Sequence, residues 1–205
     1  MPLLECPLSM VTPSPDPAPD AAGHLIGLAR AGDLDAFNAL VELHQRPVYS
    51  LCLRMIGNSA AAEDATQEAF VSAYRNIGAF KGSNFRAWIM RIAANASIDE
   101  MRRRARRGAF SLDVPPPGSD EPLDPPAPDP GPEDLALRSE QRSRIQAALL
   151  RLPDDQRLAV VMCDIEGFAY EEIAETTRTS LGTVKSRIAR GREKLRVLLA
   201  AERNK

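Results

Sequence analysis

The stretch from Gly167 to Leu195, GFAYEEIAETTRTSLGTVKSRIARGREKL, is acidic in its first half and rich in arginine and lysine in its second. Basic side chains along one helix can read guanine edges in duplex DNA and neutralise phosphates. The chain has only two histidines and three isolated cysteines, and it has no Gly-rich phosphate loop. No nucleophile–base pair, metal site or cofactor motif is visible, so the sequence predicts a non-enzymatic protein with no cofactor.

The same stretch predicts two short helices joined by a polar turn, with Ser180 as the N-cap of the second. Buried positions of the second helix recur at helical spacing: Leu181, Val184, Ile188 and Leu195. Candidate DNA contacts on its other faces are Thr183, Lys185, Ser186, Arg187, Arg190 and Arg192. This layout is typical of a helix-turn-helix, whose second helix enters the major groove. The plainer alternative is a helical hairpin with a solvated charged face.

Charge is strongly segregated along a chain whose overall formal charge is −2. Residues 24–107 carry twelve basic and eight acidic residues, and 135–205 carry fourteen basic and ten acidic residues. Residues 108–134 carry seven acids and no lysine or arginine. The segments with helical patterns are therefore the basic ones, which favours a polyanionic partner.

Proline marks the expected boundaries, because six of the 17 prolines lie in residues 1–19 and nine lie in 115–132. We expect a disordered tail over 1–23, a folded domain over 24–107, a flexible acidic Pro-rich linker over 108–134, and a second folded domain over 135–205. Both domains read as helical, so the predicted fold class is all-α, with two small helical domains. Pro47 is expected to kink or split a long helix, and Ser59 to cap the next one.

Cysteine usage and hydropathy favour a cytoplasmic protein. Cys52 and Cys163 lie in apolar helical stretches and are expected to pack in the core. Three unpaired cysteines fit a reducing compartment better than a disulfide framework. No apolar run approaches the length of a membrane span, and no signal peptide is visible.

Taken together, the two domains resemble regions 2 and 4 of an extracytoplasmic-function (ECF) sigma factor of bacterial RNA polymerase. The segment LPDDQRLAVVMCDIEGFAYEEIAETTRTSLGTVKSRIARGREKLRVLL resembles region 4, and DAFNALVELHQRPVYSLCLRMIGNSAAAEDATQEAFVSAYRNIGAFKGSNFRAWIMRIAANASIDEMRRRARR resembles region 2. The resemblance implies a protein that binds polymerase core and makes it promoter-specific. Region 4 would read the −35 element as duplex, and region 2 would recognise and melt the −10 element.

The resemblance also implies where region 2 contacts its partners. The −10 candidates are Phe80, Lys81, Ser83, Asn84, Phe85, Asn95, Asp99, Arg102 and Arg103. A captured base leaves the stack at a cost of a few kcal/mol, which a pocket must offset. Trp88 has two readings, core packing or contact with unpaired bases. The arginines from Arg102 to Arg107 also have two interpretations: they form a basic helix end that suits the helix dipole, or they contact phosphates.

Asp64, Gln67 and Glu68 share one helix face and match the core-binding helix of the family. That face would meet the clamp coiled coil of the core, and region 4 would meet the flap. Without the resemblance, the face of Asp64, Gln67 and Glu68 would be interpreted as a solvated acidic face.

An anti-sigma factor is a further expected partner, and the acidic linker would thread the active-site cleft. This sequence departs from the family in a shorter loop at 80–85, a polar TTRTS turn, and Ala189 and Gly191 in the recognition helix.

Three other functions were weighed against this interpretation. A stand-alone helix-turn-helix regulator would bind duplex DNA without polymerase, and it leaves the first domain unexplained. An enzyme lacks any visible catalytic group. An adaptor that binds only proteins predicts no salt-dependent DNA binding by either domain.

Overall fold

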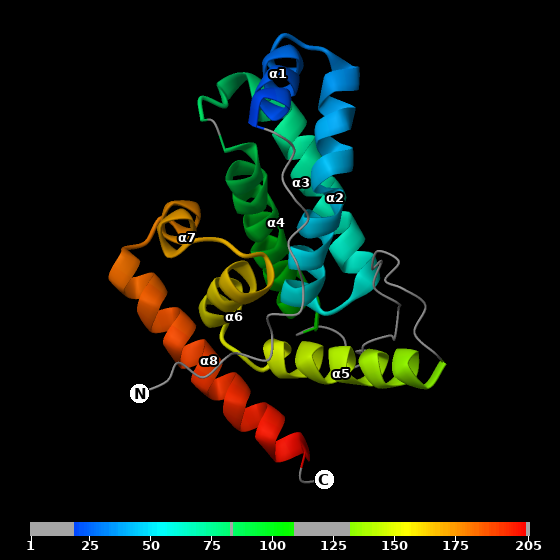
Figure 1. Cartoon of the computed structure of the whole chain (residues 1–205), viewed down its shortest axis with the longest axis vertical. Helices are drawn as coiled ribbons and strands as arrows, with labels where there is room; N and C mark the ends of the chain where they lie inside the picture. The colour runs from blue at the N-terminus through cyan, green and yellow to red at the C-terminus, as the bar shows by residue number, and fades with distance from the viewer. Residues whose placement is uncertain (1–18, 83, 109–131, 204–205) are drawn as a thin grey trace.

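The computed structural model describes residues 19–82, 84–108 and 132–203 (Figure 1). These residues form helices and their connections, with no strand among them. The helices are α1 (Pro19–Arg30), α2 (Leu34–Ile56), α3 (Ser59–Asn76), α4 (Phe85–Gly108), α5 (Pro132–Leu150), α6 (Asp154–Val160), α7 (Tyr170–Thr177) and α8 (Leu181–Arg203). A 3-10 turn, η1 (Ile77–Ala79), follows α3, and a π-helical turn, η2 (Val161–Ile165), continues α6. The predicted all-helical fold class is confirmed for this part of the chain.

Helices α1 to α4 pack as one bundle, and α5 to α8 form a second group beside its lower end (Figure 1). Helix α1 begins at Pro19, inside the segment predicted as a tail, and residues 1–18 lie outside the described residues. Helix α4 ends at Gly108 and α5 begins at Pro132, so most of the predicted linker also lies outside them. The predictions on the charge and path of the linker therefore fall outside the described residues.

The bundle is held by a stripe of small residues on α3. Ala62, Ala65, Ala69 and Ala73 are all buried, and α3 packs against both α2 and α4 along this stripe. Side chains of this size let neighbouring helices approach closely, and burial of the larger side chains of α2 and α4 supplies most of the apolar driving force. The predicted Ala stripe of α3 is thus the contact face of the bundle.

Pro47 was expected to kink or split the helix; α2 is continuous through it, so the split is wrong. Proline removes only one backbone hydrogen bond, and apolar packing continues on both sides of it. Leu40 precedes Pro47, Val48 and Leu51 follow it, and all three are fully buried. Because both halves bury the same face, the helix continues through Pro47.

The turn between α2 and α3 uses two residues with defined local roles. Gly57 ends α2 with φ 76°, a left-handed conformation that favours glycine. Asn58 is the N-cap of α3, and its side chain accepts a hydrogen bond from the amide of Ala61 at 3.0 Å. The prediction that Ser59 caps this helix was therefore wrong by one residue, because asparagine at position 58 satisfies the amide first.

Candidate nucleic-acid and polymerase interface

The helix-turn-helix is formed by α7, a turn at Arg178–Ser180, and α8. The side chain of Glu172 accepts from the amide of Ala169 at 2.9 Å and closes the start of α7. Arg178 ends α7 with φ 53°, a conformation in which glycine is common and arginine is not. Ser180 Oγ accepts from the amide of Thr183 at 3.2 Å, so the predicted N-cap is confirmed.

Gly191 lets α8 pack directly against α6. A Cβ at this position would lie 2.6 Å from a methyl group of Val160 and 3.3 Å from the carbonyl oxygen of Gln156. The glycine that departs from the family pattern is thus required by a close helix–helix approach. Val184, Ile188 and Leu195 are buried on the same side of α8, as predicted.

Two predicted DNA-contacting residues of α8, Lys185 and Arg190, have exposed side chains, and neither has an ion pair with another described residue. Thr183 and Ser186 are half-buried and already have hydrogen bonds: the Thr183 hydroxyl pairs with that of Ser180 at 2.9 Å, and the Ser186 hydroxyl donates to the Thr183 carbonyl at 2.9 Å. Among the six predicted contacts of α8, the cations without an ion pair to another described residue are therefore those at positions 185 and 190.

Arg187 and Arg192 are paired with carboxylates of the same domain. Arg187 Nε lies 3.0 Å from Asp155 of α6. Arg192 binds Asp164 through two nitrogens, with Nε at 3.0 Å, and the Asp164 side chain is only 6% exposed. The Asp164 carboxylate raises the pKa of Arg192. Through these ion pairs both arginines link α8 to the preceding helices, a role that sequence reasoning did not assign to them.

Cys163 lies beside this second ion pair. Burial, followed by the Asp164 charge, raises the pKa of its thiol to about 11. Cys163 is half-buried, and Cys52 is fully buried in the other domain, so the prediction of core packing is confirmed for Cys52 and only partly for Cys163. Both thiols are protonated at neutral pH, which makes them poor nucleophiles.

The loop before α4 is built over an aromatic cluster. Phe80 and Phe85 are 5% and 3% exposed, and their ring centroids lie 5.0 and 5.5 Å from that of half-buried Trp88. The rings of Phe80 and Phe85, two of the −10 candidates, are therefore covered in this structure, and their contact with DNA stays a prediction. They pack beneath the loop and fix its shape. Trp88 packs against both rings while staying half-buried.

The exposed groups of this loop are Lys81 and Asn84. Asn84 caps α4, because its Oδ1 accepts from the amide of Ala87 at 2.9 Å. Ser83, another predicted −10 residue, lies outside the described residues. The described residues of the loop therefore offer one cation and one amide at its surface.

The remaining predicted residues of the bundle meet between α3 and α4. Asp64, Gln67 and Glu68 are all exposed on α3, as their spacing predicted. Glu68 accepts from Arg103 of α4 at 2.7 Å, and Arg103 also binds Glu100 at 3.1 Å. A hollow of about 190 Å³ lies between the two helices, lined by Glu68, Ser72, Ile92, Asn95, Ala96 and Asp99. Arg102 lies 3.5 Å from Asp99 at its edge.

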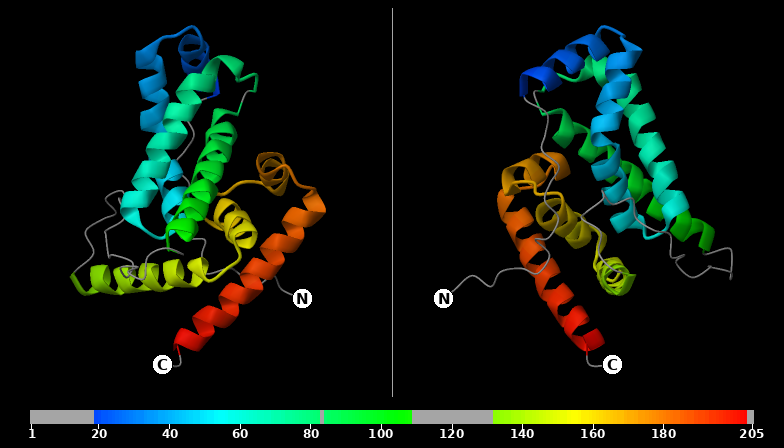
Figure 2. Two further views of the ribbon diagram at one scale, coloured as in Figure 1. Left: turned by 180° about the vertical axis from the view of Figure 1, so that it is seen from behind. Right: turned by 45° about the vertical axis from the view of Figure 1, so that its right-hand side comes forward.

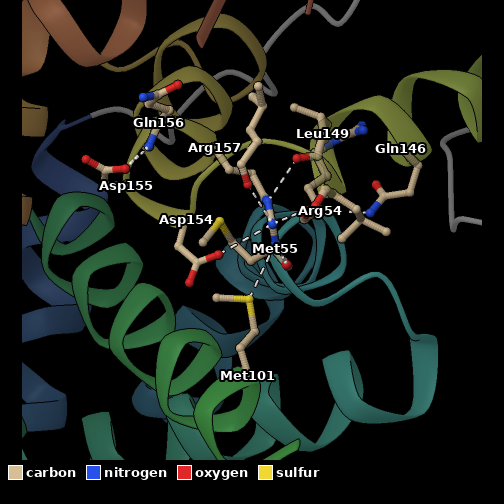
Figure 3. A network of polar contacts seen from close by, with 11 residues as sticks. Arg54, Met55, Met101, Gln146, Leu149, Asp154, Asp155, Gln156 and Arg157 are labelled. Atoms are coloured by element: carbon tan, nitrogen blue, oxygen red, sulfur yellow. Dashed lines mark hydrogen bonds and ion pairs between the residues drawn. The ribbon is translucent and has the colours of Figure 1, made fainter. Parts of the chain in front are cut away.

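Sequence reasoning missed Arg157, which lies at the centre of Figure 3. Its side chain is 7% exposed and donates to the carbonyls of Leu149, Leu150 and Leu152 at 3.0 Å each, and also to the carbonyl of Met55. Burial lowers its pKa, although the nearby Asp154 carboxylate opposes the shift. Nothing in the motif LPDDQR distinguishes a buried arginine that donates to several backbone carbonyls from one that is solvated.

Neither metal chemistry nor a membrane span is visible in the described residues. They contain no group of three His, Cys, Asp or Glu side chains able to hold an ion. None of the helices within these ranges is long and apolar enough to cross a bilayer.

Comparison with known families agrees with this layout. Residues 40–107 match Sigma-70 region 2, and residues 142–195 match Sigma-70 region 4. The chain is 40% identical to the ECF RNA polymerase sigma factor SigE of Mycolicibacterium smegmatis over 93% of this chain and 71% of that protein. It is 39% identical to the ECF sigma factor SigW of Bacillus subtilis over 82% of this chain and 90% of that protein.

Two solved structures have a similar fold. One is the sigma factor RpoE in complex with the anti-sigma factor NepR from Bartonella quintana, with a TM-score of 0.65 and 26% identity over 82% of this chain and 98% of that one. The other is CnrH in complex with the cytosolic domain of CnrY, with a TM-score of 0.63 and 27% identity over 89% of this chain and 99% of that one. Matches to both regions, in order and over 71% and 90% of the two relatives, show that this chain belongs to the ECF sigma factors, non-catalytic proteins that direct transcription initiation through regions 2 and 4.

Proposed function

We propose that region 4, residues 135–205, recognises the −35 element as duplex DNA through the exposed face of α8. The observation that carries this proposal is the contrast between its basic side chains: Lys185 and Arg190 have no ion pair with another described residue, whereas Arg187 and Arg192 are in ion pairs within the domain. In this proposal Arg190 pairs with a guanine and Lys185 with a guanine or a phosphate, while Thr183 and Ser186 lie near the same end of the helix.

Region 2, residues 24–107, captures the −10 element at the loop and along α4. Lys81 and Asn84 contact bases or backbone at the loop, with Ser83 between them, and Phe80 and Phe85 support the loop from below. Asn95 and Asp99 line the hollow beside α3, and Arg102 and Arg103 lie at its rim. Acceptors inside a hollow with guanidinium groups outside suit a nucleotide, whose base carries donors and whose phosphate is anionic.

Polymerase core binds the exposed acidic face of α3 through its clamp coiled coil. Asp64, Gln67 and Glu68 offer two carboxylates and an amide on one face, remote from the α7–α8 unit. Region 4 contacts the flap. Since two solved relatives of similar fold are complexes with anti-sigma partners, this chain also binds an anti-sigma factor.

The test is transcription by purified bacterial core with this chain, using fragmented genomic DNA and mapping of start sites. The proposal requires start sites with a shared −35 and −10 pair that depend on the chain. Stable duplex binding by the chain alone, with no effect on core, would favour a stand-alone regulator instead.

A further inference from the structure

Arg178, in the turn between α7 and α8, has a backbone conformation that suits glycine. Its φ is 53°, and among the described residues it is the one residue other than glycine with a positive φ. The amide of Arg178 donates to the carbonyl of Glu175 at 3.3 Å, and that of Thr179 donates to the carbonyl of Ala174 at 3.0 Å. This pair of bonds forms a Schellman C-cap, in which glycine avoids the clash that a Cβ makes with the backbone.

Neighbouring side chains hold the turn in this shape. The Thr177 hydroxyl donates to the carbonyl of Ile173 at 2.7 Å, and it lies 2.9 Å from the Thr179 hydroxyl. Ser180 caps α8 directly afterwards. Because the turn is fixed on both sides of Arg178, the strain at that residue remains in the folded chain.

The side chain of Arg178 has no ion pair or hydrogen bond with another described residue that could offset this strain. It is exposed, and so are Glu171 and Glu175 of the same short helix, yet neither acid is paired with it. Arg187 and Arg192 of α8, in contrast, each have a carboxylate partner. The fold alone therefore favours glycine at position 178.

A glycine lies near this arginine, at a position that suits alanine. Gly182 is exposed in the first turn of α8, and among the described residues a Cβ there would have only Ser180 Oγ, at 3.9 Å, within 4 Å. Alanine is the better helix former, and no contact within the described chain requires glycine here. The absent side chain leaves space beside the start of α8, where the backbone of a partner can approach closely.

The turn lies where a helix-turn-helix meets DNA. Figure 2 shows the α7–α8 turn at the outer edge of the molecule in both views, at the opposite end of α8 from the C-terminus. Two residues span at most about 7 Å of chain, so the backbone of Arg178 is that close to the cap residue Ser180. In this motif the start of the second helix enters the major groove, and the preceding segment crosses the phosphate backbone. An exposed guanidinium in the turn can therefore reach a phosphate, which it binds through two hydrogen bonds.

We propose that Arg178 is a phosphate anchor of region 4, which contacts the DNA backbone beside the −35 element while Lys185 and Arg190 contact the groove. This inference rests on the proposed −35 function of α8. A phosphate contact carries no sequence information, so Arg178 adds affinity for duplex DNA without adding preference for one sequence. This role accounts for an arginine at a position where the fold favours glycine.

Three variants separate the charge of Arg178 from its backbone conformation. Arg178→Gly removes the cation and the strain, so its urea midpoint rises by about 0.5 M while its affinity for DNA falls. Arg178→Lys keeps the cation and the strain. The matched control is Arg151→Ala, which removes an exposed cation of the same domain from the connection between α5 and α6.

The experiment measures the Kd of holoenzyme, assembled from purified core and each full-length variant, over a series of salt concentrations. The probes are two fluorescein-labelled duplexes, a promoter mapped for this chain and the same promoter with a scrambled −35 element. We expect Arg178→Gly to weaken binding to both duplexes about tenfold at about 0.1 M salt. The slope of log K against log salt concentration becomes shallower by about 0.9, the value for one phosphate contact. Arg178→Lys keeps the wild-type slope, and Arg151→Ala matches the wild type in slope and affinity.

Wild-type affinity and slope in Arg178→Gly would overturn the inference, as would equal slopes in Arg178→Gly and Arg178→Lys. A loss confined to the intact −35 element would also overturn it, because Arg178 would then read a base. Lys185→Ala/Arg190→Ala tests the function on which the inference rests. If that variant keeps both wild-type affinity and wild-type −35 preference, the proposed −35 function of α8 is itself refuted.

Discussion

Arg190 and Arg192 lie two residues apart on α8, and the structure predicts opposite consequences for their removal. Arg192→Ala leaves the carboxylate of Asp164, 6% exposed, without its cation. Breaking a buried pair costs about 3–5 kcal/mol, and because the Arg192 side chain is itself 41% exposed we reduce this to about 2 kcal/mol. With a urea m-value of about 2 kcal/mol/M, the unfolding midpoint falls by roughly 1 M.

Arg190→Ala, in contrast, leaves the free energy of unfolding within about 0.5 kcal/mol of the wild-type value, because the side chain is exposed. It weakens −35 recognition by about 1–3 kcal/mol if the guanidinium pairs with a guanine. The assay is urea unfolding of each full-length variant, followed by holoenzyme binding to promoters with intact and altered −35 elements. Removing both partners in Asp164→Ala/Arg192→Ala recovers much of the stability, because no buried charge is left unpaired.

The reasoning fails if Arg192→Ala unfolds at the wild-type urea concentration and yet loses −35 preference. That result would make Arg192 a DNA contact and its ion pair incidental. An unchanged −35 preference in Arg190→Ala would exclude Arg190 as a base reader.

The remaining predictions concern core binding, packing, capping and pH. Glu68→Lys weakens binding to polymerase core in a titrated pull-down and leaves the chain folded, because the ion pair with Arg103 that it removes is exposed to solvent; wild-type affinity would remove this residue from the interface. Gly191→Ala destabilises by about 1–2 kcal/mol in urea although alanine is the better helix former, since its Cβ would lie 2.6 Å from a methyl group of α6; a gain in stability would show that α8 is not held this close. Asn58→Ala costs about 1 kcal/mol through the lost cap, and an unchanged midpoint would argue against that hydrogen bond. Burial raises the pKa of Glu166, so its contribution to stability falls as pH rises from its unfolded value through its folded one. The urea midpoint of Glu166→Gln should therefore increase relative to the wild-type midpoint as pH rises. Midpoints that change in parallel with pH in both chains would contradict this.

Helical periodicity predicted the elements that position the site. The stripe from Ala62 to Ala73 and the buried positions Val184, Ile188 and Leu195 were all read correctly, because each faces a single neighbouring surface at a constant spacing. The polar turn and its Ser180 cap were also readable, since capping depends on residues three apart. These features need no knowledge of distant segments.

Side-chain roles that depend on distant segments could not be predicted. Arg187, Arg190 and Arg192 look alike in sequence, and only the carboxylates of Asp155 and Asp164 distinguish them. Phe80 and Phe85 resembled pocket residues because a loop was expected to expose them, yet they close the aromatic cluster below it.

Contacts between the two domains were likewise invisible in sequence. Arg157 lies 102 positions from Met55, to whose carbonyl it donates, and Gln146 lies 93 positions from Leu53. Periodicity cannot indicate a partner so far along the chain. Backbone carbonyls also leave no residue-type signal, because every residue has one.

The central claim is that this chain gives bacterial polymerase core its choice of start sites through two separate helical domains. The most direct measurement is in vitro transcription with purified core on a mapped promoter, comparing wild type with Lys185→Ala/Arg190→Ala and with Glu68→Lys. The account predicts chain-dependent transcripts from wild type, loss of −35 dependence in the first variant, and loss of core recruitment in the second. Failure of the wild-type chain to start transcription at any site would contradict it.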